Sequence, residues 1–147
     1  MAKSRNILTL FLTILLCSYL LSWTSFAAVN PGITSPQYSY TSAVRCSLSI
    51  STNGVASCKG NIRAKNDTSK VSIKLRLLRK NGTSWTPVKT WEKNDQLSYG
   101  SLDKDCSVSA GTYKLVVSGS VTTTEGRTEF VSTSSGEKVY SNGSGGT

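Results

Sequence analysis

Hydrophobic side chains recur at every second position along most of the chain after residue 43. In the clearest stretch, residues 71–77, four aliphatic side chains alternate with three polar ones: Val71, Ile73, Leu75 and Leu77 with Ser72, Lys74 and Arg76. Because successive side chains of a β-strand point to opposite faces, this alternation predicts strands with one buried and one solvent-facing side. No stretch after residue 28 has a helical period, so the pattern predicts an all-β fold.

Short turn motifs separate these strands. Asn53-Gly54 and Asn81-Gly82 favour tight hairpins because both residue types tolerate positive φ. Glu125-Gly126 marks a further turn, after which Phe130 is expected to point inward. About six to eight short strands, separated by turns every ~8–15 residues, are typical of a sandwich or a barrel. Of the two, we expect a small antiparallel β-sandwich.

The segment SAGTY, residues 109–113, opens one of the hydrophobic strands. It resembles the tyrosine corner of immunoglobulin-like domains, in which a tyrosine hydroxyl ties a loop back to the backbone. We therefore expect an immunoglobulin-like sandwich over residues 44–140. An extended segment over residues 28–43 precedes it, and a Gly/Ser-rich, disordered tail over residues 141–147 follows it.

The N-terminal residues have the pattern of a secretory signal peptide. Lys3 and Arg5 precede an apolar run over residues 7–21, and small residues follow up to Ala27, where we expect cleavage. A membrane anchor is the competing interpretation, but the run is shorter than the roughly 20 residues that span a bilayer. We expect a secreted, extracellular protein with no transmembrane anchor in the mature chain. Removing residues 1–27 takes away two positive charges and no acid, so the net charge falls from +9 to +7.

Three cysteines remain after this cleavage: Cys46, Cys58 and Cys106. In an oxidising compartment one disulfide is expected, and three different single pairings are possible. On a chain-entropy model a Cys58–Cys106 bridge is worth about 4 kcal/mol and a Cys46–Cys58 bridge about 3 kcal/mol, so energetics does not choose between them. The chain has no histidine and no Cys-x-x-Cys spacing, so no metal site is expected.

Four segments together resemble an uncharacterised family of short secreted β-sandwich proteins from Gram-positive bacteria, a domain of unknown function. These segments are YSYTSAVRCSLSIS (residues 38–51), NGVASCKGNI (53–62), VSIKLRLLRKNGTSWTPVKTW (71–91) and CSVSAGTYKLVV (106–117). The resemblance covers roughly residues 36–124, and its motifs are strand patterns without a catalytic signature. It implies a secreted β-sandwich in which Cys58 pairs with Cys106.

Catalytic motifs are not evident. Without histidine the chain lacks the commonest general base and every Ser-His or Cys-His pair. Ser101 and Lys104 have a Ser-x-x-Lys spacing, but on a strand these positions face opposite sides. Asp103 and Asp105 share a face, yet calcium sites draw about six to eight oxygens from several elements. We expect no enzymatic activity and no cofactor.

The most informative functional feature is a basic segment, residues 59–80, in which eight lysines and arginines accompany one acid, Asp67. If its two strands form a hairpin, alternation places five cations toward one solvent face: Lys59, Arg63, Lys65, Lys74 and Arg76. Such a face would suit an anionic cell-wall or extracellular polysaccharide. The alternative is a solvated face that prevents edge-to-edge aggregation. Nucleic acid is not expected, because no aromatic residue lies among these cations to stack on bases.

Two tryptophans support a different hypothesis. Trp85 and Trp91 share strand parity, so one face is expected to hold both rings. If that face is exposed, the rings could stack on sugars as in carbohydrate-binding modules. The alternative is packing in the core, where tryptophan is usually found. A purely structural or adhesive domain is the remaining possibility.

Overall fold

The computed structural model describes residues 37–67 and 69–142. Within them the regular secondary structure consists of strands: β1 (Thr41–Ile50), β2 (Val55–Ala64), β3 (Lys70–Asn81), β4 (Ser84–Leu97), β5 (Tyr99–Ser107), β6 (Gly111–Thr122), β7 (Thr128–Ser134) and β8 (Lys138–Tyr140). The expected signal peptide lies outside the described residues, as do most of the expected extended segment and of the tail. Residues 41–43, expected in the extended segment, already belong to β1.

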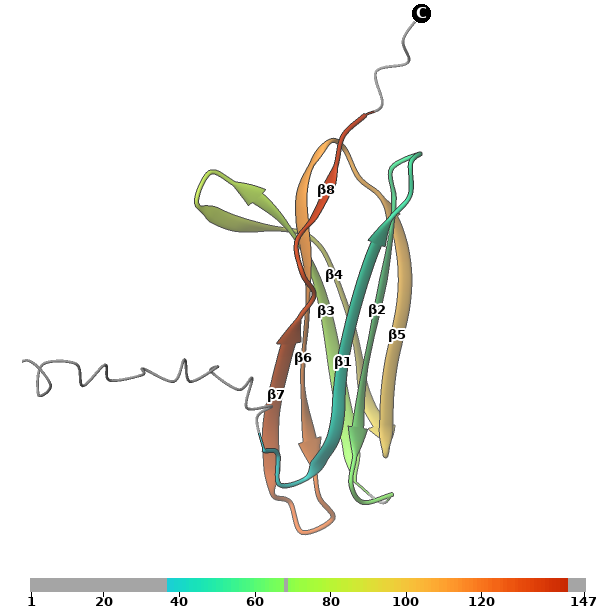
Figure 1. The fold of residues 1–147 in the computed structure, drawn as a ribbon. Coiled ribbons are helices and arrows are strands. Elements are labelled where there is room, and N and C mark those ends of the chain that lie inside the picture. Colours follow the sequence, from blue (N-terminus) through green and yellow to red (C-terminus); the bar gives the residue numbers. More distant parts are fainter. Residues whose placement is uncertain (1–36, 68, 143–147) are drawn as a thin grey trace, which may run out of the picture. The chain divides into compact units, whose positions relative to one another are not determined.

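The strands form two antiparallel sheets (Figure 1). The three-stranded sheet has the order β1-β2-β5. The five-stranded sheet has the order β4-β3-β6-β7, and β8 pairs with β6 beyond the end of β7. This division of the first seven strands confirms the expected immunoglobulin-like β-sandwich.

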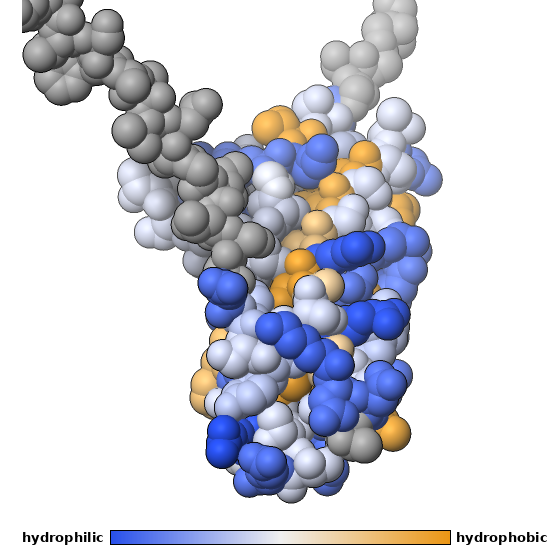
Figure 2. Space-filling model, turned by 60° about the horizontal axis from the view of Figure 1, so that its bottom comes forward, coloured by the Kyte–Doolittle hydropathy of each residue, from blue (hydrophilic) through white to orange (hydrophobic). Residues whose placement is uncertain are grey.

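The core lies between the two sheets and is built from the alternation seen in the sequence. Val71, Ile73, Leu75 and Leu77 of β3 are at most 1% exposed. Side chains from β2 and β6 pack against them, including Cys58, Ile62, Leu115 and Val117. Burial of each large aliphatic side chain contributes about 1.5–3 kcal/mol, so the inner rows hold the sheets together. On the side of the molecule shown in Figure 2, hydrophilic residues cover most of the surface and hydrophobic ones form small, separate groups.

The expected turns are present. Gly54 and Gly82 adopt φ values of 76° and 60° in the hairpins that join β1 to β2 and β3 to β4. L-residues with side chains rarely adopt these values, so glycine at these positions allows the tight turns. The tip of the β3–β4 hairpin projects from the body of the sandwich (Figure 1).

The tyrosine corner is also confirmed. Tyr113 near the start of β6 is 1% exposed, and its hydroxyl donates a hydrogen bond of 2.7 Å to the backbone oxygen of Ser109. The bond fixes the loop that leads from the three-stranded sheet into the five-stranded one.

A carboxylate ties the start of β1 to the edge strand of the opposite sheet. Glu129 of β7 accepts hydrogen bonds from the N–H groups of Ser39 and Tyr40, at 2.6 and 3.1 Å, and from the Thr41 hydroxyl at 2.7 Å. Partial burial raises the pKa of Glu129, but the hydrogen bond from Thr41 and those from the backbone outweigh it and hold the pKa below its usual value.

Candidate functional site

The cations of the basic segment lie on two different sheets. β2 pairs with β1 and β5, whereas β3 pairs with β4 and β6, so the chain crosses from one sheet to the other between β2 and β3. The expected hairpin of these two strands is therefore wrong. Alternation defines which side chains share a face of one strand, but it does not identify the neighbouring strand. As a result, Lys59 and Arg63 lie on the outer face of the three-stranded sheet. Lys74 and Arg76 lie on the outer face of the five-stranded sheet. Lys65 lies beyond the end of β2, where its Nζ donates to the Tyr38 backbone oxygen at 2.6 Å.

The outer face of the three-stranded sheet carries three cations and two acids. Lys59 forms an ion pair of 2.9 Å with Asp103 on β5, and a hydrogen bond to that carboxylate raises the pKa of the lysine. The Arg63 guanidinium lies 5.2 Å from the centre of the Tyr99 ring. Asp105 adds a further negative charge to this face, next in the row after Asp103. Arg45 is exposed on the same face and forms no ion pair among the described residues, so this face keeps a net positive charge.

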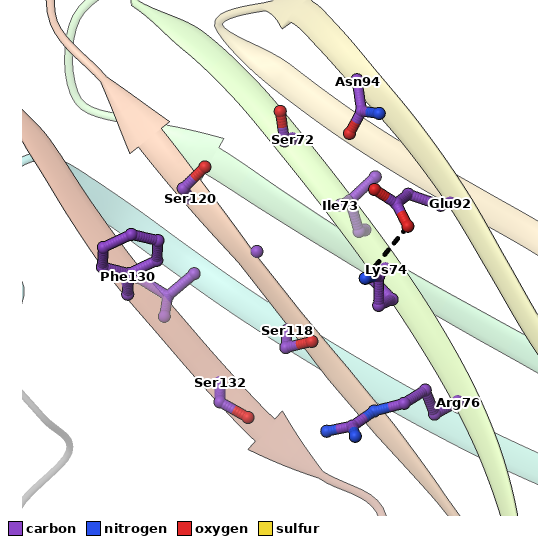
Figure 3. Close-up of a pocket in the computed structure, with 12 residues that line it drawn as sticks. Ser72, Ile73, Lys74, Arg76, Glu92, Asn94, Ser118, Ser120, Phe130 and Ser132 are labelled. Atoms are coloured by element: carbon purple, nitrogen blue, oxygen red, sulfur yellow. Dashed lines mark ion pairs between the residues drawn. The ribbon is translucent and has the colours of Figure 1, made fainter. Parts of the chain in front are cut away.

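The outer face of the five-stranded sheet contains an open groove of about 590 Å³ (Figure 3). Small residues of β3, β6 and β7 form its floor: Ser72, Ser118, Gly119, Ser120 and Ser132. Phe130 of β7 borders one side, and polar side chains of β3 and β4 border the other: Lys74, Arg76, Glu92 and Asn94. We call this site the outer groove.

Glycine is required in the floor of the outer groove. A Cβ atom at Gly119 would lie 2.0 Å from the Ser72 backbone oxygen and 2.5 Å from Cδ1 of Ile62. Both distances are shorter than real contacts, and one partner is backbone that cannot swing away. The absent side chain therefore lets β6 keep its close approach to β3 beneath the groove.

Of the two cations in the outer groove, one is paired with an acid and the other is not. Lys74 forms an ion pair of 3.0 Å with Glu92, and hydrogen bonds from Lys74 and Asn94 lower the pKa of that carboxyl. Arg76 is exposed and forms no ion pair within residues 37–67 and 69–142. Its guanidinium extends from β3 across β6 toward Ser118 (Figure 3). Arg76 is thus available to an external anion.

A second cluster of positive charge lies on the same outer face. Lys114 of β6 alternates with two buried residues and lies diagonal to Arg76, since it pairs with Leu78. Its Nζ is 4.2 Å from the centre of the Trp85 ring. Lys80 approaches the same ring at 5.7 Å and forms an ion pair of 3.3 Å with Glu137.

The two tryptophans lie on opposite faces, so the expected shared platform is wrong. An irregularity in β4 pairs Leu77 with Lys89 but Leu78 with Pro87, which leaves one extra residue in β4. This bulge reverses the alternation, so that Trp91 pairs with Leu75 and packs against the core while Trp85 pairs with Lys80. Pro87, which cannot donate to the ladder, was the available signal for an interrupted strand.

The exposed ring of this sheet is instead Phe130, which the sequence predicted to point inward. Phe130 is 81% exposed, while the next residue, Val131, is 4% exposed and belongs to the core. Because Phe130 and Val131 are adjacent in a short strand, alternation does not show which of the two side chains points to the core. The sequence contains no further signal that decides this.

The three cysteines among the described residues, Cys46, Cys58 and Cys106, lie on the inner side of the three-stranded sheet as free thiols. The described residues thus contain no Cys58–Cys106 disulfide, although the two thiols form a side-chain hydrogen bond with each other. Burial raises the pKa of Cys58 to about 12 and also raises that of Cys106. The Cys46 thiol donates to the Leu115 backbone oxygen at 3.3 Å.

Among the described residues no group of three acidic or sulfur ligands could hold a metal ion. No helix in this part of the chain is long and apolar enough to cross a membrane. A scan against models of known protein families finds no match, and a search among curated proteins finds no significant similarity. The resemblance to secreted Gram-positive bacterial proteins therefore stays a prediction.

Proposed function

We propose that this chain is a secreted, non-enzymatic binding domain that holds anionic extracellular polymers on the outer face of the five-stranded sheet. The observation that carries the proposal is the outer groove, which places an unpaired cation beside an open polar surface. Arg76 lines this groove and forms no ion pair among the described residues, and neither does Lys114 on the same face. Arg45 and Arg63 on the other sheet also form no ion pair in this part of the chain, but they do not line the groove. The basic N-terminal residues and the apolar run after them support export.

The spacing of these free cations suits a polymer. Arg76 and Lys114 occupy diagonal positions on adjacent strands, and such positions lie about 7–8 Å apart. A polymer segment longer than this separation can therefore contact both side chains. The strands hold the backbone of both residues in place, so binding needs to order only the side chains.

The test compares two substitutions that remove the same charge from opposite faces. Arg76→Ser removes a cation from the outer groove, and Arg63→Ser removes one from the three-stranded sheet. On a heparin column, Arg76→Ser should elute at lower salt than wild type, with an affinity about tenfold weaker, equivalent to one charge-assisted hydrogen bond. Arg63→Ser should elute with wild type.

Equal shifts for the two variants would show that net charge alone governs retention, which contradicts a specific face. If wild-type protein passes through the column at low salt, the binding proposal fails. A purely structural or adhesive role would then be the better account.

A further inference from the structure

We propose that the outer groove binds an acidic polysaccharide, with one pyranose ring stacked on Phe130 and a carboxylate of the same polysaccharide chain bound by Arg76. This inference rests on the proposed function and narrows its ligand to a polysaccharide that contains uronic acid. The two sides of the groove would recognise different parts of such a ligand.

One side of the groove offers a flat apolar surface. The Phe130 ring is 81% exposed on β7, and its partner across the strand pair is Ser120, a small residue. The side chain of Val131 supplies the core contact at this point of the strand, so the fold itself does not need the aromatic ring. The negative face of an aromatic ring attracts the weakly positive C–H groups on the face of a sugar.

The other side offers groups that fit a carboxylate and hydroxyls. The planar guanidinium of Arg76 matches a carboxylate in a two-bond geometry that a lysine cannot reproduce. The ion pair with Lys74 holds the Glu92 carboxylate in place, where it can accept hydrogen bonds from sugar hydroxyls. The hydroxyl of Ser118 on the floor lies between the two sides (Figure 3).

The combination selects one ligand class. A neutral sugar would leave Arg76 without an anion, and an inorganic polyanion would leave Phe130 without a ring to stack on. An acidic polysaccharide satisfies both groups. In the strand register Phe130 lies opposite Ser120 and Arg76 lies opposite Val116, four residues away on β6, so one unit of the chain can stack on the ring while the carboxylate of a neighbouring unit reaches the guanidinium. The groove volume of about 590 Å³ lies within the usual ~300–1,000 Å³ of small-ligand sites.

The experiment measures binding of polygalacturonate and of polyphosphate at equal ionic strength, using Phe130→Ala and a control, Val139→Ala. Val139 is 77% exposed on β8 of the same sheet and does not line the groove. Phe130→Ala should weaken polygalacturonate binding about tenfold and leave polyphosphate binding unchanged. Val139→Ala should change neither, and Phe130→Trp should restore polygalacturonate binding. Because the ring is exposed, circular dichroism should show all variants folded.

The outcomes separate this inference from the proposed function. If wild type binds both polymers and Phe130→Ala binds them equally well, the stacking inference is overturned while the anionic-polymer proposal stands. An equal loss for both polymers would also overturn the inference, since polyphosphate has no ring. If wild type binds neither polymer, both proposals fail.

Discussion

Removal of one oxygen atom from the tyrosine corner should destabilise the domain by a defined amount. The Tyr113 ring is 1% exposed, and its hydroxyl makes a single hydrogen bond of 2.7 Å to the Ser109 backbone oxygen. Tyr113→Phe keeps the ring packing and deletes that bond. A typical hydrogen bond contributes about 0.5–1.5 kcal/mol net. Ser109 lies in an exposed loop, where water can satisfy its oxygen, so we expect a loss of about 1 kcal/mol.

This free energy can be read from thermal unfolding. For a domain of about 100 residues, 1 kcal/mol lowers Tm by roughly 4–8 °C. The matched control is Tyr99→Phe, which deletes the same atom from a ring that is 41% exposed and whose hydroxyl makes no hydrogen bond to the described residues. Its free energy of unfolding should stay within about 0.5 kcal/mol of wild type. Urea unfolding should show an unchanged m-value for both variants.

Equal Tm values for the two variants would show that the Tyr113 hydrogen bond does not stabilise the domain. The Tyr113 hydroxyl would then contribute no more to the free energy of unfolding than the exposed hydroxyl of Tyr99. Other contacts would hold the loop between β5 and β6.

Two further predictions concern the edge strand and the thiols. Glu129→Gln should cost about 1–2 kcal/mol at pH 7, because an amide cannot accept all the hydrogen bonds that the carboxylate does. Since the pKa of Glu129 is lowered in the folded state, its stabilisation is present above the unfolded pKa near 4.3 and disappears as pH falls through the folded pKa. Between about pH 5 and 3, the range in which carboxyls titrate, the Tm of wild type should therefore fall more steeply than that of Glu129→Gln. If the two Tm curves run parallel over this range, this carboxylate does not stabilise the fold. In an oxidising glutathione buffer, Cys58 and Cys106 should join and Cys46 should remain a thiol, with a gain of about 4 kcal/mol in stability; peptide mapping that finds Cys46 in the bridge would contradict this.

Much of the fold could be predicted because it depends on local patterns. The alternation over residues 71–77 predicted the buried row of β3, and the position of Tyr113 in its strand predicted the corner. The Asn-Gly pairs predicted two of the hairpins because positive φ is a local backbone requirement.

The candidate site could be predicted only in part, because it depends on which strands are neighbours. Arg76 was among the predicted binding residues, but Phe130 was not, since its adjacent valine leaves the facing of β7 undetermined. The crossing between β2 and β3 depends on tertiary packing, and the bulge in β4 consists of one extra residue. Alternation of hydrophobic and polar residues predicts neither feature. Trp85 was consequently assigned to the face of Trp91.

Amide chemical-shift mapping by NMR, with oligogalacturonate added to labelled protein, shows directly which face of the sandwich binds anionic polysaccharide. If the outer face of the five-stranded sheet is the binding surface, the largest shifts should fall on Ser72, Arg76 and Ser118, while Lys59 and Arg63 should remain unchanged. Shifts confined to the strand that holds Lys59 and Arg63, or spread equally over both sheets, would contradict this assignment.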